Sequence, residues 1–158
     1  MSGDGQNRLA VLRGVRQFAL LTLDGQHWLL PRHEVQTLQS LADIDPMVRA
    51  PHSIGALAYA GEWWPVYCLS GELNMLSHLP AQRRICVVLN NRADQFALIC
   101  DHIETLAEPP DLHPLPNCMA LPESAIDALI LLDRGLVCVS STEQIARRIA
   151  AAEDLADA

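Results

Sequence analysis

Residue types that could do chemistry are present in the chain, but their spacing matches no reactive motif. No two histidines stand four apart on a predicted helix, and no His-Glu-x-x-His segment occurs. The chain has neither a Gly-x-Ser-x-Gly turn nor a glycine-rich phosphate loop. We therefore expect no catalytic residues, no cofactor and no metal, although a metal site built from distant ligands would leave no such signature. The six histidines are His27, His33, His52, His78, His102 and His113.

The neighbouring Asp101 and His102 are the best candidates for a general acid–base pair. Adjacent residues on a strand point to opposite faces, so the two side chains are not expected to meet. We expect Asp101 to end a strand and to bind amides of a loop. An enzyme with dispersed catalytic residues stays an alternative that depends on these two residues and on scattered carboxylates.

The cysteines are odd in number, and no Cys-x-x-Cys pair occurs. Four of the five lie in apolar, strand-like runs, where a free thiol behaves as a small hydrophobic side chain. The pattern predicts structural thiols in a reducing compartment. The cysteines are Cys68, Cys86, Cys100, Cys118 and Cys138.

The composition and the net charge limit the kinds of protein and partner that fit this chain. Half of the 158 residues are hydrophobic, enough for a real core, and the net charge of -8 with a pI near 5.0 disfavours nucleic acid and anionic lipid as partners. No apolar run approaches the roughly 18–20 residues that cross a bilayer, and the first residues lack a basic and apolar leader. The expectation is a cytoplasmic protein with no membrane insertion.

The elements that must position these residues are short strands joined by turns. Asp24-Gly25 and Gly61 mark tight turns between runs of strand-forming residues. Ser141 and Gln144 predict the start of a C-terminal helix. The pattern indicates an all-β fold, and an echo between the hairpins near 56 and 128 indicates two similar small barrels. The predicted strands cover 18–23, 27–30, 53–60, 62–69, 84–89, 95–100, 102–106, 129–132 and 136–139.

The rest of the chain divides less clearly. Residues 1–16 are predicted to be an N-terminal extension, loose and polar over 1–8 and either helix or strand over 9–15. Residues 34–41 fit a strand or a helical turn, 42–50 a connection, and 72–76 one helical turn. Residues 108–122 hold five of the ten prolines and predict a loop. The predicted main domain is 17–146, with a C-terminal helix over 141–158.

The hairpin over 53–69 is rich in apolar and aromatic side chains and poor in reactive ones. It resembles a segment of the CheW family, the coupling proteins of bacterial chemosensory arrays. At the specified positions of the family pattern Gly-x-x-Asn-Leu-Arg-Gly-x-x-x-Pro-x-x-Asp-Leu, this chain has Gly55, Ala58, Tyr59, Ala60, Gly61, Pro65, Cys68 and Leu69. Ordered matches over 18–31, 35–38, 48–51, 87–89, 98–103 and 136–145 extend the resemblance to about residues 17–146.

The resemblance implies a fold of two SH3-like, five-stranded β-barrels packed on a shared hydrophobic seam. It implies a non-catalytic adaptor that couples the chemoreceptor cytoplasmic tip to the regulatory domain of a CheA-like histidine kinase. The positions that would contact these partners are Val35, Thr37, Leu38, Ile54, Gly55, Tyr59, Ala60 and Ile99.

Departures from the family pattern keep other functions open. The pattern's asparagine, arginine and aspartate are Ala58, Ala60 and Cys68 here, and a glycine before the last hairpin is replaced near Asp127-Ala128. A homodimer through the same apolar seam is one alternative. A small-ligand-binding β-barrel is another, with a pocket lined by Trp28, Trp63, Trp64 and Tyr67.

Overall fold

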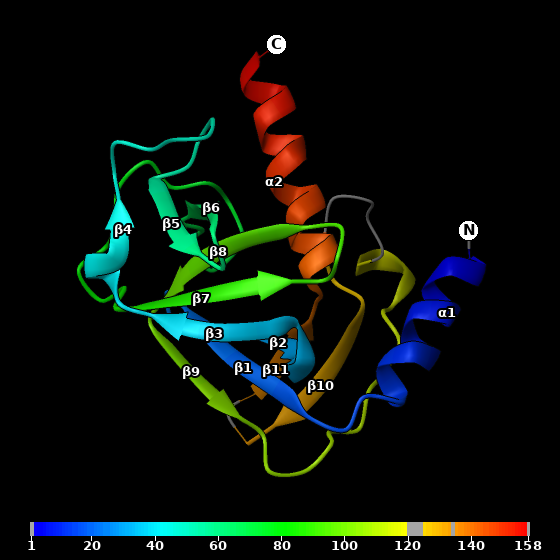
Figure 1. Cartoon of the computed structure of the whole chain (residues 1–158). Helices are drawn as coiled ribbons and strands as arrows, with labels where there is room; N and C mark the ends of the chain where they lie inside the picture. Colours follow the sequence, from blue (N-terminus) through cyan, green and yellow to red (C-terminus); the bar gives the residue numbers. More distant parts are fainter. Residues whose placement is uncertain (1, 120–124, 134, 158) are drawn as a thin grey trace.

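The computed structural model describes residues 2–119, 125–133 and 135–157, and it consists of two curved β-sheets with a helix near each end of the chain (Figure 1). In chain order the elements are α1 (Ser2–Arg13), β1 (Phe18–Leu23), β2 (Gln26–Pro31), η1 (Arg32–Glu34), β3 (Val35–Gln39), η2 (Leu41–Asp43), β4 (Ile44–Asp45), β5 (Gly55–Tyr59), β6 (Glu62–Tyr67), β7 (Ile85–Asn90), β8 (Gln95–Cys100), β9 (His102–Thr105), η3 (Asn117–Met119), β10 (Ala128–Leu132), β11 (Gly135–Val139) and α2 (Thr142–Asp157).

The two sheets repeat one strand order. The sheet called half A runs β10-β11-β2-β1-β9, and the sheet called half B runs β3-β7-β8-β6-β5-β4. Each half joins two antiparallel hairpins through one parallel pair, which is β11 with β2 in half A and β6 with β8 in half B. The predicted all-β fold and the echo between the two hairpins are confirmed, and β4 adds a sixth strand to half B.

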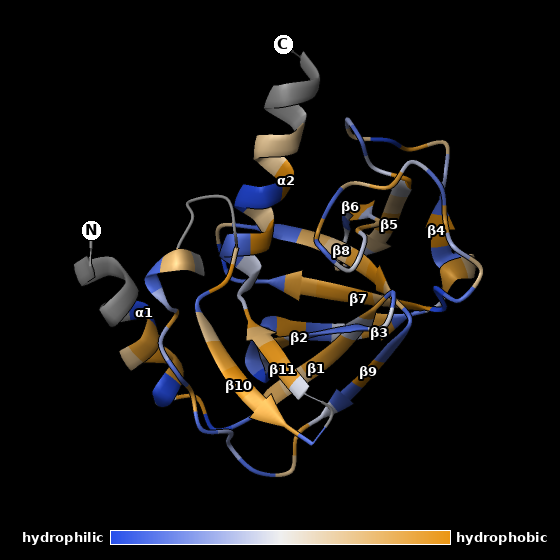
Figure 2. Cartoon of the chain, turned by 180° about the vertical axis from the view of Figure 1, so that it is seen from behind, coloured by the Kyte–Doolittle hydropathy of each residue, from blue (hydrophilic) through white to orange (hydrophobic). Residues whose placement is uncertain are grey.

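Three hydrophobic clusters hold the fold together, and Figure 2 shows the hydrophobic strands between hydrophilic connections. The seam core lies between the halves and includes Leu21, Leu98 and, from α2, Ile145. The inner core of half A includes Leu9 and Leu12 of α1. The inner core of half B is built around Leu57, Trp64, Val66, Cys86, Val88, Ala97 and Ile99. Apolar burial at about 25 cal/mol per Å² makes such clusters the main source of stability.

Helix α2 begins where the sequence predicts. The Ser141 hydroxyl accepts a hydrogen bond from the Gln144 amide at 3.2 Å, as an N-cap does. The Gln144 side chain donates instead to the Asp127 carboxylate at 2.8 Å, so the capping box is only half formed. The Thr142 amide donates to the Glu34 carboxylate at 2.7 Å, and this contact ties α2 to the β2–β3 corner.

Several local expectations need correction. The predicted loose tail over 1–8 is wrong, because α1 spans Ser2–Arg13. The predicted helical turn over 72–76 is also wrong, since Leu69 and Met75 form a β-bridge there. The open choice over 34–41 resolves as β3 after the turn η1, and β4 interrupts the connection over 42–50. Part of the predicted loop, 120–122, and Arg134 of the last hairpin turn lie outside the described residues.

Candidate functional site

A buried arginine joins the two halves at one end of the seam. Arg83 is 1% exposed, and its guanidinium forms ion pairs with Asp24 at 2.9 Å and with Asp101 at 2.7 Å. It also donates to the Ile99 carbonyl at 3.0 Å. Asp24 lies in the β1–β2 turn of half A, and Asp101 connects β8 of half B to β9 of half A, whereas Arg83 leads into β7 of half B. This cluster is therefore a structural lock rather than a reactive site.

The lock explains why Asp101 and His102 do not form an acid–base pair: Asp101 is held in the lock. Asp101 accepts a hydrogen bond from the Asp24 amide at 2.8 Å, as expected for a carboxylate that ends a strand, while His102 is exposed on β9. The Arg83 guanidinium holds the pKa of Asp24 below its usual value. The sequence showed the two aspartates, but Arg83 was missed because it lies in a loop without hydrophobic periodicity.

The described cysteines on the strands and in the seam are inert. Burial raises the pKa of Cys86 and Cys100 to about 12, and it also raises the pKa values of Cys68 and Cys138. Their thiols stay protonated near neutral pH, so they are poor nucleophiles. Cys68 is fully buried and lies 3.7 Å from Arg83, which means that this position cannot present a side chain to a partner.

The predicted contact residues all lie in half B, but they differ in accessibility. Leu38 is 50% exposed on the edge strand β3, and Ala60 is exposed in the β5–β6 turn. Thr37, Ile54 and Tyr59 are half-buried. The remaining three are buried: Val35 in the seam core, Gly55 at the start of β5, and Ile99 inside half B. These three can affect a partner only by positioning their neighbours.

Gly55 has a clear local role. A Cβ atom at this position would lie 2.7 Å from the Asp45 carbonyl oxygen and 2.9 Å from the Ile44 side chain. Only glycine therefore allows β4 to approach β5 this closely. Tyr59 packs edge-on against Trp64 with ring centroids 5.3 Å apart, so it helps to close the inner core of half B.

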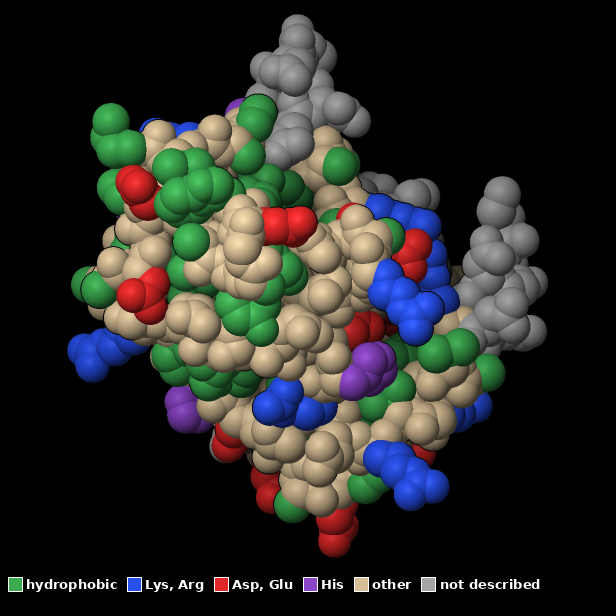
Figure 3. Space-filling view, viewed as in Figure 1, with side chains coloured by type: hydrophobic (Ala, Val, Ile, Leu, Met, Phe, Trp, Pro, Cys, Tyr) green, Lys and Arg blue, Asp and Glu red, His purple; other side chains and the backbone are tan. Residues whose placement is uncertain are grey.

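Exposed apolar side chains on the strands lie at the margins of the seam. Leu38 stands opposite Val87 of the seam core, and Trp63 shares a face of β6 with the seam residue Tyr67, four positions further on. Leu38 and the 54% exposed Trp63 therefore lie on the seam-facing side of half B, beyond the area that half A covers. Figure 3 shows hydrophobic side chains gathered over half B in this view, with arginine side chains more frequent toward α1.

The aromatic residues considered for a ligand pocket face different surroundings. Trp28 donates to the Gly71 carbonyl at 2.8 Å in the seam, and Tyr67 packs edge-on against Phe96. Trp64 lies in the inner core of half B, and Trp63 faces solvent. These four side chains do not line one common pocket.

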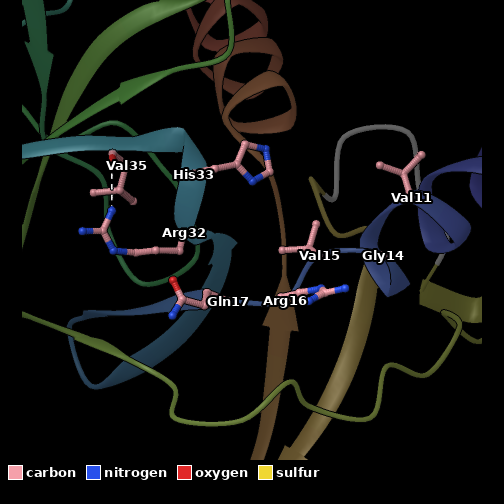
Figure 4. Close-up of a pocket in the computed structure, with 8 residues that line it drawn as sticks. All are labelled: Val11, Gly14, Val15, Arg16, Gln17, Arg32, His33 and Val35. Atoms are coloured by element: carbon pink, nitrogen blue, oxygen red, sulfur yellow. Dashed lines mark hydrogen bonds between the residues drawn. The ribbon is translucent and has the colours of Figure 1, made fainter.

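A groove lies between α1 and the β2–β3 corner (Figure 4). Its volume is about 820 Å³, and it continues past His33 into a second cavity of about 540 Å³. The first cavity is lined by Val11, Gly14, Val15, Arg16, Gln17, Arg32, His33 and Val35. Within the described residues, no group of three or more histidine, cysteine or acidic side chains is arranged to hold a metal ion.

Comparisons with known proteins agree with this geometry. The family model for the CheW-like domain matches residues 17–150. Among solved structures, the scaffolding protein TtCheW from Thermoanaerobacter tengcongensis is similar with a TM-score of 0.60 and 15% identity, over 78% of this chain and 82% of that chain. No curated protein matches the sequence. In the described part of the chain, no helix has the length and apolar character that a membrane span requires. The resemblance and the fold class predicted from the sequence are confirmed.

Proposed function

This chain belongs to the CheW-like domain family, and we propose that it couples a chemoreceptor cytoplasmic tip to the regulatory domain of a CheA-like histidine kinase in the cytoplasm. The family is one of non-catalytic scaffolds in chemotaxis signalling, in agreement with the absence of a reactive motif in the sequence. The choice of these two partners and of the contact residues is our proposal.

One observation carries the proposal most strongly: apolar side chains are left uncovered at the margins of the seam. Leu38 and Trp63 extend from strands β3 and β6 of half B, the half that also carries the predicted contact residues Ile54 and Tyr59. Contiguous exposed apolar patches mark protein-binding surfaces, and Figure 3 shows hydrophobic side chains gathered over half B. Tryptophan in particular is enriched among the residues that dominate binding energy.

The test is a binding titration of the purified chain with a chemoreceptor cytoplasmic tip fragment and with the regulatory domain of the kinase, both from the source organism. Leu38→Asp places a charge in the proposed contact and should weaken binding about tenfold, or about 1.4 kcal/mol. Leu79→Asp is the matched control, because Leu79 is 44% exposed in the loop between β6 and β7. Failure of the unchanged chain to bind either protein would contradict the proposal.

A further inference from the structure

The groove between α1 and the β2–β3 corner has a chemistry unlike that of the rest of the molecule. The chain carries 19 acidic residues against 11 arginines and no lysine. Yet the only formally charged residues that line the first cavity, in the part of the chain that the structure describes, are Arg16 and Arg32. His33 stands between them and the second cavity.

The arginines of this groove are open to an external carboxylate. Arg32 donates to the Val35 carbonyl at 3.0 Å, and no carboxylate of the described residues pairs with it. Arg16 is exposed and makes no hydrogen bond or ion pair to the described residues. By contrast, the acidic residues of the adjoining cavity already have partners: Glu34 binds the Thr142 amide, Asp127 binds Gln144 and Arg8, and Glu143 binds Arg147.

The wall opposite the corner is apolar and firmly held. Val11 and Val15 line both cavities from the α1 side, and Val11 is 70% exposed. Helix α1 is anchored by Leu9 and Leu12 in the inner core of half A and by the 3.4 Å contact between Arg8 and Asp127. The first cavity of the groove therefore combines an apolar wall with a cationic rim, and the carboxylates Glu34, Asp127 and Glu143 are confined to the second cavity.

From these features we infer that the groove binds an acidic, amphipathic helix of a partner protein. Valines at one wall would cover the apolar face of such a helix, as in other complexes of a helix in a groove. The arginines would bind its carboxylates, because the planar guanidinium pairs with carboxylates through two parallel hydrogen bonds. An elongated groove that passes His33 suits a helix better than a small compact ligand.

This inference deepens the proposed function and rests on it. Val35 begins β3, the strand that also carries Leu38, so the groove adjoins the strand on which we propose that a partner docks. Four of the eight residues that line the first cavity, Val11, Gly14, Val15 and Arg16, precede the region that the family model matches. The segment that precedes the family match would thus add Val11 of α1 and Arg16, just after α1, to the Arg32 that the family domain supplies.

The experiment is a titration of the full chain with the chemoreceptor cytoplasmic tip fragment, in which calorimetry measures the affinity at low and at high salt. Arg16→Glu and Val11→Asp should each weaken binding about tenfold. In the arginine variant, the loss should shrink as salt rises, because salt screens the charge interaction. Arg84→Glu is the matched control, because Arg84 is exposed and lies away from the groove. It directly precedes β7, whereas Val35 of the groove pairs with Leu89 near the other end of that strand.

The outcomes separate the inference from the proposed function. If the unchanged chain binds and Leu38→Asp weakens binding while Arg16→Glu and Val11→Asp do not, the groove inference fails and the proposed function stands. If the unchanged chain does not bind the fragment, the receptor part of the proposed function fails as well. Thermal unfolding of each variant tests whether it keeps the fold. Arg16→Gln is a second, uncharged variant. It should show about half the loss in log affinity, because it removes the positive charge rather than reversing it.

Discussion

Half A and half B place equivalent hairpins at equivalent positions, yet one begins with alanine and the other with glycine. Gly55 pairs with Val66 in half B, and Ala128 pairs with Val139 in half A. In half B, the short strand β4 approaches so closely that a Cβ atom would collide with its backbone. In half A, the neighbouring contact is instead a single bridge between His113 and Leu129, and Ala128 packs in the inner core. The missing glycine before the last hairpin is therefore a consequence of what lies beside each hairpin.

The halves also differ in what closes their inner cores. Half B is closed from within by Leu41 and Ile44, and by Tyr59 against Trp64. Half A is closed by α1 through Leu9 and Leu12, from a segment that precedes the family match. The comparison teaches that the same sheet can be sealed by its own connections or by an added helix, and that the added helix brings new surface with it.

The largest expected effect comes from breaking the lock between the halves. Arg83→Leu leaves two carboxylates facing a partly buried site without their counter-charge. Removing one partner of a buried ion pair typically costs 3–5 kcal/mol, and we expect about 3 kcal/mol because Asp24 can regain water. The measurement is urea unfolding at neutral pH.

The neighbouring arginine supplies the control for this change. Arg84 is exposed, so Arg84→Leu should alter the free energy of unfolding by less than about 0.5 kcal/mol. Equal stability of Arg83→Leu and the unchanged chain would show that the halves are held by the apolar seam alone.

A smaller effect is expected from the helix that closes half A. Leu12→Ala removes a side chain that is 5% exposed in the inner core and should cost about 2–3 kcal/mol. The corresponding change in half B, Leu41→Ala, removes a partly buried side chain and should cost less. Thermal unfolding of both variants tests the comparison, and a greater loss for Leu41→Ala would contradict it.

The sequence predicted the hairpins that the two halves share, but it did not predict elements found in one half only, such as α1. Hairpins at Asp24-Gly25 and Gly61 were predictable because turn glycines separate runs with strand propensity. Helix α1 was not, since its sequence lacks a clear amphipathic pattern, and its role depends on contacts with Leu112 and Asp127 about 100 residues away. For the site, the contact residues that the resemblance predicts all lie in half B, but the resemblance could not show that Val35, Gly55 and Ile99 are buried.

The lock also predicts a dependence on pH. The Arg83 guanidinium lowers the pKa of Asp24 in the folded state, so its carboxylate stabilises the fold above its unfolded pKa of about 3.9. That contribution is lost as the pH falls through the lowered folded pKa. Asp24→Asn should therefore be less stable at neutral pH and lose less stability than the unchanged chain between pH 5 and about pH 3. Parallel acid profiles in urea unfolding would contradict this assignment.

The smallest effect compares the two tight turns. The central residues have φ values of 51° and 82° at Asp24 and Gly25, and of 51° and 81° at Ala60 and Gly61. Both are two-residue loops with positive φ throughout, which favour Asn-Gly or Asp-Gly. Half A has the favoured aspartate, whereas half B has Ala60, whose Cβ makes this conformation costly by about 1 kcal/mol.

Ala60→Asn should therefore stabilise the fold by about 1 kcal/mol, measured as an increase in the urea midpoint with an unchanged slope. Ala58→Asn is the matched control, because Ala58 is exposed on the extended strand β5, where asparagine is disfavoured. An equal gain in stability at Ala58 would mean that an exposed polar side chain, and not the turn conformation, causes the stabilisation. A gain confined to Ala60 would show that half B keeps a strained turn at a position where we also expect a partner to dock, so the same variant should then be compared in the receptor titration.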